Sequence, residues 1–324
     1  MKRRYFIKLI GGAAAAVAWP LQLGAQQPST RRIAFVHSGF PAAKLSESGG
    51  VFWIKTFYEE LRKLGYAEGT NLVVERFSAE GNTSRYASLA AEVVARAPEL
   101  IVANQNVLVK ALTTATATIP IVGITTDPIA FGLVSNIARP GGNLTGVSVD
   151  GGAGLNAKRL QILKEIVPAA TRIAFVTSRR QEIEALGVPI IERLLAEVTE
   201  TELGRVLDEM AREKIDAVLV SQGGDFLAHR TLIVGLAAKH RLPAMYPFRD
   251  YVELGGLVAY APDLGELAKR MAADVQQILN GAKAGDIPFW QPAKWEMVIN
   301  LKTAKTLGLA IPQGAIIQAD EVIE

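Results

Sequence analysis

Hydrophobic positions in the first half of the chain alternate between short apolar runs and longer stretches with helical spacing. The run over 32–37 is followed by Ser38 and Gly39, which predicts a buried strand and a turn. Over 51–64 the apolar residues recur at helical spacing and Gly65 follows, which predicts a helix with a glycine cap. Similar patterns predict strands over 71–77, 100–103, 120–124 and 144–149, and helices over 84–95 and 107–116. This order is typical of a parallel sheet with helices on both faces.

The pattern begins again in the second half of the chain. Arg-Ile-Ala-Phe-Val occurs at 32–36 and at 172–176, and each copy opens a series of strands and helices. Strands are predicted over 172–176, 190–194, 217–220, 244–246 and 257–260, and helices over 202–212, 226–239 and 264–279. A length of 324 residues fits two domains of about 150 residues each. We therefore predict an α/β protein of two similar lobes, with a hinge near 148–152 that uses Gly151, Gly152 and Gly154.

Residues 1–25 have the features of a secretory signal peptide. An apolar stretch over 9–18 separates the basic start from Ala25, after which we expect cleavage; the basic residues are Lys2, Arg3, Arg4 and Lys8. The apolar stretch is about half of the ~20 residues that span a bilayer, and a short anchor or buried helix is the alternative. The Arg-Arg pair resembles the twin-arginine export signal, which we favour over general secretion. The sequence therefore predicts a periplasmic protein.

The composition is that of a folded protein, with 49% hydrophobic and 21% charged residues. The formal net charge is +3, but the first 25 residues contain four basic and no acidic residues. The rest of the chain balances 31 basic against 32 acidic residues, which argues against nucleic-acid binding. Cysteine is absent and there are three histidines, so disulfides and thiolate metal sites are excluded and we expect no metal site.

Sequence motifs of the common enzyme classes are absent. The chain has no Gly-x-x-x-x-Gly-Lys-Ser/Thr loop, no Gly-x-Gly-x-x-Gly after the first strand, no Gly-x-Ser-x-Gly and no His-Glu-x-x-His. Asp127, Asp150 and Asp225 each follow a predicted strand, where a carboxylate could act in acid–base chemistry, hold an ammonium group or cap a helix. We favour the last two roles, and we assign cap or surface roles to His37 and His240. We therefore expect neither an enzyme nor a cofactor.

Small polar residues gather at the ends of the predicted strands. In open parallel sheets, ligands bind outside the carboxyl ends of the strands, and two facing lobes form a cleft there. Uncharged hydroxyls and amides, helix N-termini and one or two carboxylates suit a small zwitterion. The expected ligand-binding residues are Ser38, Asn104, Gln105, Thr125, Thr126, Asp127, Ser148, Gln222 and Tyr246.

Asp127 is the candidate partner of a ligand ammonium group. It follows the strand over 120–124 and precedes Pro128, which biases its backbone towards an extended form at the carboxyl end of the sheet. A structural alternative stays open, in which Asp127 accepts backbone N–H bonds within the Asp-Pro turn.

Distinctive segments run over essentially the whole chain after residue 25. Two stand out, Arg139-Pro140-Gly141-Gly142-Asn143 and Ile299-Asn300-Leu301-Lys302-Thr303-Ala304-Lys305. Others are Leu64-Gly65-Tyr66-x-Glu68-Gly69-x-Asn71, Asp127-Pro128-x-x-x-Gly132-Leu133-Val134 and Ala319-Asp320-Glu321-Val322-Ile323. With these segments the chain resembles the ABC transporter substrate-binding protein family related to the tryptophan- and tyrosine-binding proteins. The resemblance implies a type I periplasmic-binding-protein fold, in which two Rossmann-like lobes close on a ligand, and a membrane permease and ATPase as partners.

The implied fold also suggests domain boundaries. Residues 1–25 are then the signal peptide, 31–147 with about 263–292 form one lobe, and 148–262 with about 293–324 form the other. The chain departs from the family after the first strand of the second lobe, where about ten residues leave room for a helix over 181–186 of two turns at most. Because this short crossover borders the cleft, we leave Thr177 and Ser178 out of the expected ligand contacts.

The predicted function is the capture of an amino acid or small aromatic acid by a monomeric periplasmic solute-binding protein of an ABC importer. The alternative is a periplasmic subunit of the same fold that reports a ligand to a membrane signalling protein. Neighbouring permease and ATPase genes would favour the importer, and a neighbouring kinase gene would favour the sensor. A periplasmic enzyme on a doubly wound fold is a third, less favoured interpretation.

Overall fold

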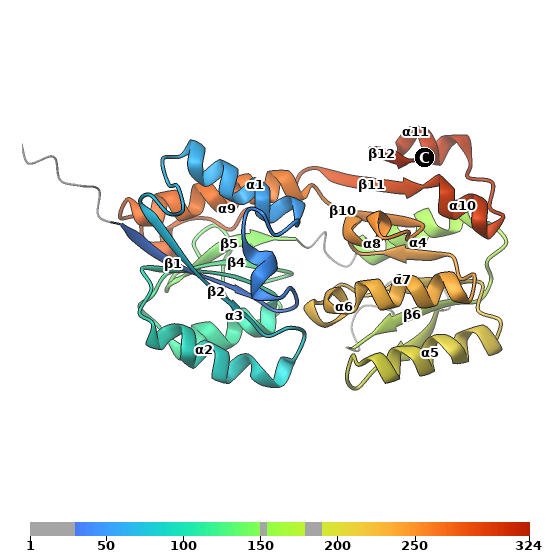
Figure 1. The fold of residues 1–324 in the computed structure, drawn as a ribbon, viewed down its shortest axis with the longest axis horizontal. Coiled ribbons are helices and arrows are strands. Elements are labelled where there is room, and N and C mark those ends of the chain that lie inside the picture. The colour runs from blue at the N-terminus through green and yellow to red at the C-terminus, as the bar shows by residue number, and fades with distance from the viewer. Residues whose placement is uncertain (1–29, 150–153, 179–189) are drawn as a thin grey trace, which may run out of the picture.

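The chain folds around two separate β-sheets, each at the centre of one lobe (Figure 1). The structure is a computed structural model that describes residues 30–149, 154–178 and 190–324. We call the lobe around the five-stranded sheet lobe 1 and the lobe around the seven-stranded sheet lobe 2. Within these described ranges, no helix has the length and apolar character needed to cross a bilayer. The signal peptide predicted over 1–25 lies outside the described residues.

The sheet of lobe 1 has the strand order β2-β1-β3-β4-β5, and all neighbouring pairs are parallel. Helices α1 and α9 cover one face and α2 and α3 the other (Figure 1), so the central strands are apolar on both sides. The strands are β1 (Arg31–His37), β2 (Leu72–Ser78), β3 (Leu100–Asn104), β4 (Ile121–Thr125) and β5 (Leu144–Ser148). The helices are η1 (Ala42–Leu45), α1 (Phe52–Lys63), η2 (Thr83–Arg85), α2 (Tyr86–Ala95), α3 (Asn106–Ala115), α9 (Leu264–Leu279) and η4 (Ala284–Asp286).

The sheet of lobe 2 has the order β12-β11-β10-β9-β8-β6-β7. Its strands are β6 (Ile173–Thr177), β7 (Ile190–Leu194), β8 (Ala217–Val220), β9 (Ala244–Tyr246), β10 (Val258–Pro262), β11 (Trp295–Asn300) and β12 (Glu321–Ile323). The pair β10–β11 is antiparallel, whereas we predicted parallel sheets. The reason is that β10 runs towards lobe 1 and β11 returns from it, so the two strands point in opposite directions.

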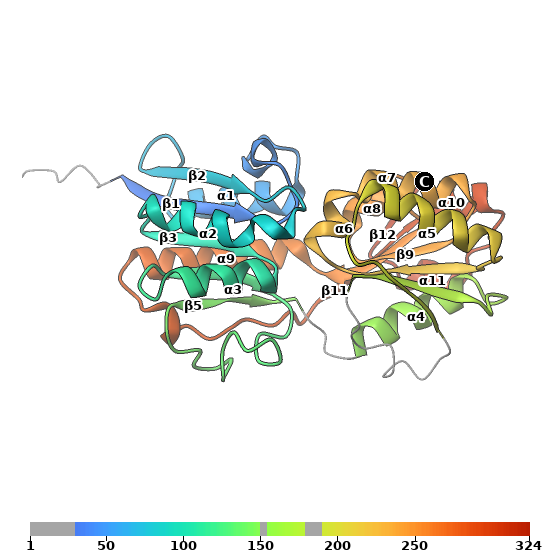
Figure 2. The ribbon, with the colours of Figure 1, turned by 90° about the horizontal axis from the view of Figure 1, so that it is seen from below.

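Helices also cover both faces of the second sheet. Figure 2 shows α5 and α7 on one face and α4 and α11 on the other. The helices of lobe 2 are α4 (Gly154–Ile166), α5 (Glu200–Arg212), α6 (Gly224–Ala228), α7 (Arg230–Lys239), α8 (Arg249–Glu253), α10 (Leu301–Leu307) and α11 (Gln313–Gln318). The carboxyl ends of the parallel strands of both lobes therefore lie at the facing edges of the two sheets.

The chain passes between the lobes after β5, before α9 and before β11. Helix α9 follows a strand of lobe 2 but packs on α1 in lobe 1 (Figure 2). Its apolar face buries Leu267, Met271 and Val275 in the core. The expected hinge glycines Gly151 and Gly152 lie outside the described residues, and Gly154 is the first residue of α4.

Most predicted elements lie within a few residues of an observed one, and the differences have physical causes. The helix predicted over 226–239 is two helices, α6 and α7, which meet at His229. The sequence patterns do not predict α4, because its buried face includes the charged Arg159 and the apolar spacing is correspondingly weak. They also miss the short elements α8, α10, α11, β11 and β12. The helix predicted over 181–186 lies outside the described residues.

Candidate functional site

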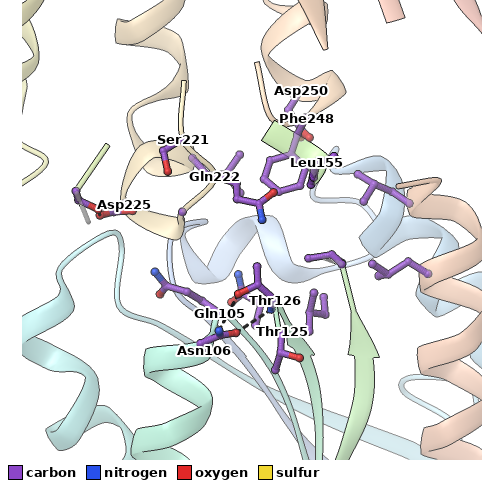
Figure 3. A pocket seen from close by; sticks show the side chains of 18 of the residues that line it. Gln105, Asn106, Thr125, Thr126, Leu155, Ser221, Gln222, Asp225, Phe248 and Asp250 are labelled. Carbon is purple, nitrogen blue, oxygen red and sulfur yellow. Dashed lines mark hydrogen bonds between the residues drawn. The ribbon is translucent and has the colours of Figure 1, made fainter. Parts of the chain in front are cut away.

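A cavity of about 180 Å³ lies between the two lobes and is lined by both (Figure 3). Lobe 1 contributes the carboxyl ends of β1, β3 and β4 and the start of α3. Lobe 2 contributes the ends of β6 and β8 and the starts of α4 and α8. The polar lining residues are His37, Asn104, Gln105, Asn106, Thr125, Thr126, Asn156, Thr177, Ser178, Ser221, Gln222, Asp225 and Asp250. No lysine or arginine occurs among the lining residues that the structure describes.

The lobe 1 wall of the cavity is uncharged and held by its own hydrogen bonds. Asn106 donates from Nδ2 to the Thr126 hydroxyl at 2.7 Å and accepts the Thr126 backbone N–H at Oδ1 at 2.8 Å (Figure 3). Asn104 is fixed in the same way by Ser38, whose N–H donates to Oδ1 at 2.8 Å and whose hydroxyl accepts from Nδ2 at 3.0 Å. These bonds set the amide orientations before any ligand enters, which reduces the entropy lost on binding.

Gln105 adopts an unusual backbone conformation at the start of α3. Its φ of 70° and ψ of 131° lie outside the regions that non-glycine residues normally occupy. The conformation is held because the Gln105 N–H donates to the Ile124 carbonyl at 2.8 Å, and its side-chain oxygen accepts from the Tyr86 hydroxyl. Strain of this kind costs on the order of 1–3 kcal/mol and clusters at functional sites. Gln105 is therefore a strong candidate for ligand contact.

The lobe 2 wall carries the carboxylates of the cavity. Asp225 accepts the backbone N–H of Phe226 at 3.0 Å through Oδ1 and the Ser178 hydroxyl at 3.1 Å through Oδ2. Burial raises the pKa of Asp250 and Glu253 raises it further, whereas the positive charge of Arg230 opposes both. Lobe 2 therefore offers acceptors for a cationic group, while lobe 1 offers neutral donors and acceptors.

Gln222 lies between these carboxylates, and the buried Arg159 fixes its side chain by hydrogen bonds. Its Oε1 accepts hydrogen bonds at 3.3 Å from both terminal nitrogens of Arg159. Arg159 is almost completely buried and also donates to the carbonyls of Tyr260 at 2.9 Å and Pro247 at 3.2 Å. With Oε1 facing the guanidinium, the Gln222 amide nitrogen is the group left to donate to a ligand.

Apolar side chains from both lobes complete the lining of the cavity. Phe248 points into it from lobe 2 in Figure 3, and Leu155 lies beside it. The remaining apolar lining residues are Trp53, Ile124, Val149, Phe175, Leu227, Leu264 and Leu267. An apolar cavity of about 150 Å³ can hold a benzene ring, so the space suits a small ligand with one ring or a compact aliphatic group.

Five of the expected ligand-binding residues line the cavity: Asn104, Gln105, Thr125, Thr126 and Gln222. Thr177 and Ser178, which we left out because of the short crossover, line it as well. The cause is that β6 ends at the facing edge of the sheet like the other strands, and the crossover length does not change that position.

Three other expected residues lie behind the wall rather than in it. Ser38 is completely buried beneath Asn104. Ser148 is 1% exposed at the end of β5, where its N–H donates to the Trp290 carbonyl at 2.8 Å. Tyr246 is 1% exposed and stacks on Tyr251 at 5.0 Å between ring centroids, inside the core of lobe 2. Alternation along a strand turns these side chains away from the cavity.

Asp127 is exposed and does not line the cavity. Its Oδ1 accepts the backbone N–H groups of Ile129 at 3.1 Å and Ala130 at 2.9 Å. The Asp127 carboxylate therefore stabilises the Asp-Pro turn, which is the structural role given above as the alternative to ligand binding. The carboxylates that do line the cavity are Asp225 and Asp250.

Sequence patterns miss several lining residues for identifiable reasons. His37 and Asn106 each lie next to an expected residue, so the prediction from polar residues at strand ends was correct to within one position. Asp250 follows β9 by four residues and begins no predicted element, so no local pattern marks it. Asp150, the third carboxylate considered, lies outside the described residues.

Direct contacts between the lobes border the cavity. The Arg230 guanidinium of lobe 2 lies 4.6 Å from the ring centroid of Phe40 in lobe 1. Arg249 of lobe 2 likewise lies 5.2 Å from the ring of Phe52 in lobe 1. Gly81 of lobe 1 is so close to α6 that a Cβ there would lie 2.9 Å from the Cβ of Ala228. The lobes are thus in contact through residues of α6, α7 and α8.

Residues suited to a metal ion are not clustered. The part of the chain that the structure describes contains no group of three or more histidine, aspartate or glutamate side chains placed to hold a metal.

The chain matches a known protein family over most of its length. The model of the ABC transporter substrate binding protein family matches residues 45–323. The tyrosine-binding protein of Clostridioides difficile (strain R20291) is 24% identical over 272 residues, which cover 79% of this chain and 76% of the relative.

Solved structures share the same fold. The ABC domain from Streptococcus pneumonia in complex with L-Trp has a TM-score of 0.78 and 24% identity, covering 91% of this chain and 100% of that chain. A conserved domain protein from Vibrio cholerae has a TM-score of 0.79 with the same identity and coverage. The neighbours have two α/β lobes, as this chain does.

Proposed function

The chain belongs to the ABC transporter substrate binding protein family, and we propose that it binds an amino acid or small aromatic acid in the cavity between its lobes. Members of this family bind small solutes and are not enzymes. The observation that carries the proposal is that the cavity combines carboxylates from lobe 2, uncharged amides from lobe 1 and apolar side chains from both lobes. An α-amino acid has one group for each of these kinds of side chain.

The ligand chemistry follows from the lining residues. An ammonium group would pair with Asp225 or Asp250, and such charge-assisted hydrogen bonds contribute about 1.5–3 kcal/mol. A carboxylate would meet the amide donors of Asn104 and Asn106 near the N-terminus of α3, where the helix dipole favours negative charge. The apolar lining around Phe248 and Leu155 would contact the side chain. Two relatives support an aromatic side chain, since one is named for tyrosine and another was solved with L-Trp.

The cellular role is part of the same proposal. The basic and apolar pattern over 1–25 supports export to the periplasm, with the twin-arginine route favoured by Arg3-Arg4. Proteins of this family work with membrane permease and ATPase subunits, and we assign this chain to an importer of that kind as a monomer. The two sheets support the boundaries given above, with 31–147 and about 263–292 in lobe 1 and 148–262 and about 293–324 in lobe 2.

The test is a thermal-shift screen of the mature protein against the standard L-amino acids and small aromatic acids, followed by calorimetry. A ligand at 100 times its Kd should stabilise the protein by about 2.7 kcal/mol. We expect L-tyrosine or L-tryptophan among the ligands. The absence of any shift from all amino acids and aromatic acids would refute the proposed ligand class. Mass spectrometry of the same protein from its host should show a start near Gln26, and an intact Met1 would refute cleavage.

A further inference from the structure

His37 is buried at the carboxyl end of β1 and borders the cavity. Its Nδ1 accepts two backbone hydrogen bonds, from the N–H of Gly39 at 3.0 Å and of Phe40 at 2.8 Å. The imidazole is also packed between two rings, with centroid distances of 4.7 Å to Phe40 and 6.2 Å to Trp53. The ring therefore has one defined orientation.

These contacts fix the protonation state of the ring. A nitrogen that accepts two N–H donors carries no proton, so in the neutral imidazole the proton is on Nε2. Burial lowers the pKa of His37 to about 3, and the nearby charge of Arg230 lowers it as well. The ring is consequently neutral at every pH near neutrality, with Nε2 as a donor only. None of the described residues accepts a hydrogen bond from Nε2.

We propose that His37 determines ligand specificity by donating its Nε2–H to an acceptor oxygen on the part of the ligand that faces lobe 1. The ligand class is an organic molecule with a carboxylate or hydroxyl oxygen at that position. Because the tautomer is fixed, the same site rejects an ammonium group, which has hydrogens and no lone pair to offer. The inference rests on the proposed function only in taking the ligand to be a small polar solute in this cavity.

Two substitutions separate the donor role of His37 from its role in the turn. In His37→Asn the amide oxygen can replace Nδ1 as the acceptor for Gly39 and Phe40, but nothing replaces Nε2–H. In His37→Gln the amide nitrogen reaches the Nε2 position, but the turn loses its acceptor. His240→Asn is the control, because His240 lies outside the cavity and pairs with Asp208 on the surface.

Calorimetry with L-tyrosine and L-tryptophan gives the expected order. We expect His37→Asn to weaken binding roughly tenfold and His37→Gln less than threefold, with His240→Asn unchanged. A purely structural role of His37 predicts the reverse, with normal affinity in His37→Asn and the greater loss in His37→Gln. That reversed order would overturn the inference.

Nitrogen-15 NMR of the histidine side chains tests the tautomer without any ligand. We expect the His37 signal to show a protonated Nε2 and a bare Nδ1, with no titration between pH 5 and pH 8. A protonated Nδ1, or titration near pH 6, would overturn the inference even if amino acids bind. Failure of the wild-type protein to bind any amino acid, with the tautomer as expected, would refute the proposed ligand class and not the donor.

Discussion

The two walls of the cavity differ in charge and in the way they are held. On lobe 1, the amides of Asn104 and Asn106 are fixed by neutral hydrogen bonds within the same lobe. On lobe 2, Asp225 and Asp250 line the cavity, and the cations Arg159 and Arg230 lie behind the wall. A zwitterion is therefore expected to bind with its ammonium group towards lobe 2.

This division also predicts a link between ligand binding and lobe closure. Arg230 acts on both walls, since its charge opposes the raised pKa of Asp250 and its guanidinium lies over Phe40 of lobe 1. A cation–π contact of this kind contributes about 0.5–2 kcal/mol and exists only while the lobes are together. A ligand that contacts both walls adds to that free energy, so the closed state is favoured when the cavity is filled.

The largest expected effect concerns the charged wall. Asp225→Asn keeps the side-chain oxygen that accepts the Phe226 N–H but removes the negative charge. Loss of a charge-assisted bond of about 1.5–3 kcal/mol should weaken amino-acid binding roughly 10- to 100-fold in calorimetry. The matched control is Asp127→Asn, which removes an exposed carboxylate outside the cavity and should leave affinity unchanged. Equal affinities in the two variants would show that Asp225 does not hold the ammonium group.

A smaller effect is expected from the contact between the walls. Gly81 and Gly69 both have left-handed backbones, with φ of 83° and 80°, so alanine at either position strains lobe 1 by about 1 kcal/mol. Only Gly81→Ala places a Cβ 2.9 Å from Ala228 of lobe 2, whereas the Cβ in Gly69→Ala meets nothing within 4 Å. Steric overlap of this size costs on the order of 1 kcal/mol, which predicts about fivefold weaker binding for Gly81→Ala.

Calorimetry and small-angle scattering of these two variants would check the prediction. Both should lose similar thermal stability, but Gly69→Ala should bind normally and contract normally on adding ligand. If both variants bind like the wild type, the contact between Gly81 and α6 does not form in the liganded protein.

The smallest expected effect concerns the protonation state of Asp274, a carboxyl group in the core of lobe 1. Asp274 on α9 is completely buried, and burial raises its pKa from 3.8 to about 7 although Arg270 lies 3.0 Å away. Because the folded-state pKa is raised, protonation of Asp274 stabilises the fold fully below about pH 4, and this stabilisation is lost progressively as the pH rises from about 4 to about 7. Asp274→Asn mimics the protonated form.

Denaturant unfolding of Asp274→Asn and the wild type would measure this effect. At pH 8 the variant should be more stable than the wild type by at least about 1 kcal/mol, and this difference should shrink as the pH falls from 7 towards 4. Ligand affinity should be the same in both, since Asp274 does not line the cavity. The same stability difference at pH 8 and at pH 4 would show that folding does not raise the pKa of Asp274.

The apolar patterns of the sequence determine the strands and most of the helices. Strands such as β1 and β3 are apolar on both sides because helices cover both faces of their sheet. For this reason they can be predicted from the sequence alone. The same local logic identifies Asn104, Gln105 and Thr125 as cavity residues, because the carboxyl ends of buried parallel strands lie at the facing edge of the sheet.

Only the tertiary structure decides features that join distant parts of the chain. Asp127 and Asp225 both follow a strand in the sequence. Which of them lines the cavity depends on the local turn in which each carboxylate accepts backbone N–H bonds. The neutral state of His37 depends on burial and on Arg230, which is almost 200 residues away. The assignment of α9 to lobe 1 and the antiparallel β11 depend on where the chain crosses between lobes. Local patterns record the environment along one element, whereas these features arise from packing between elements that the sequence separates.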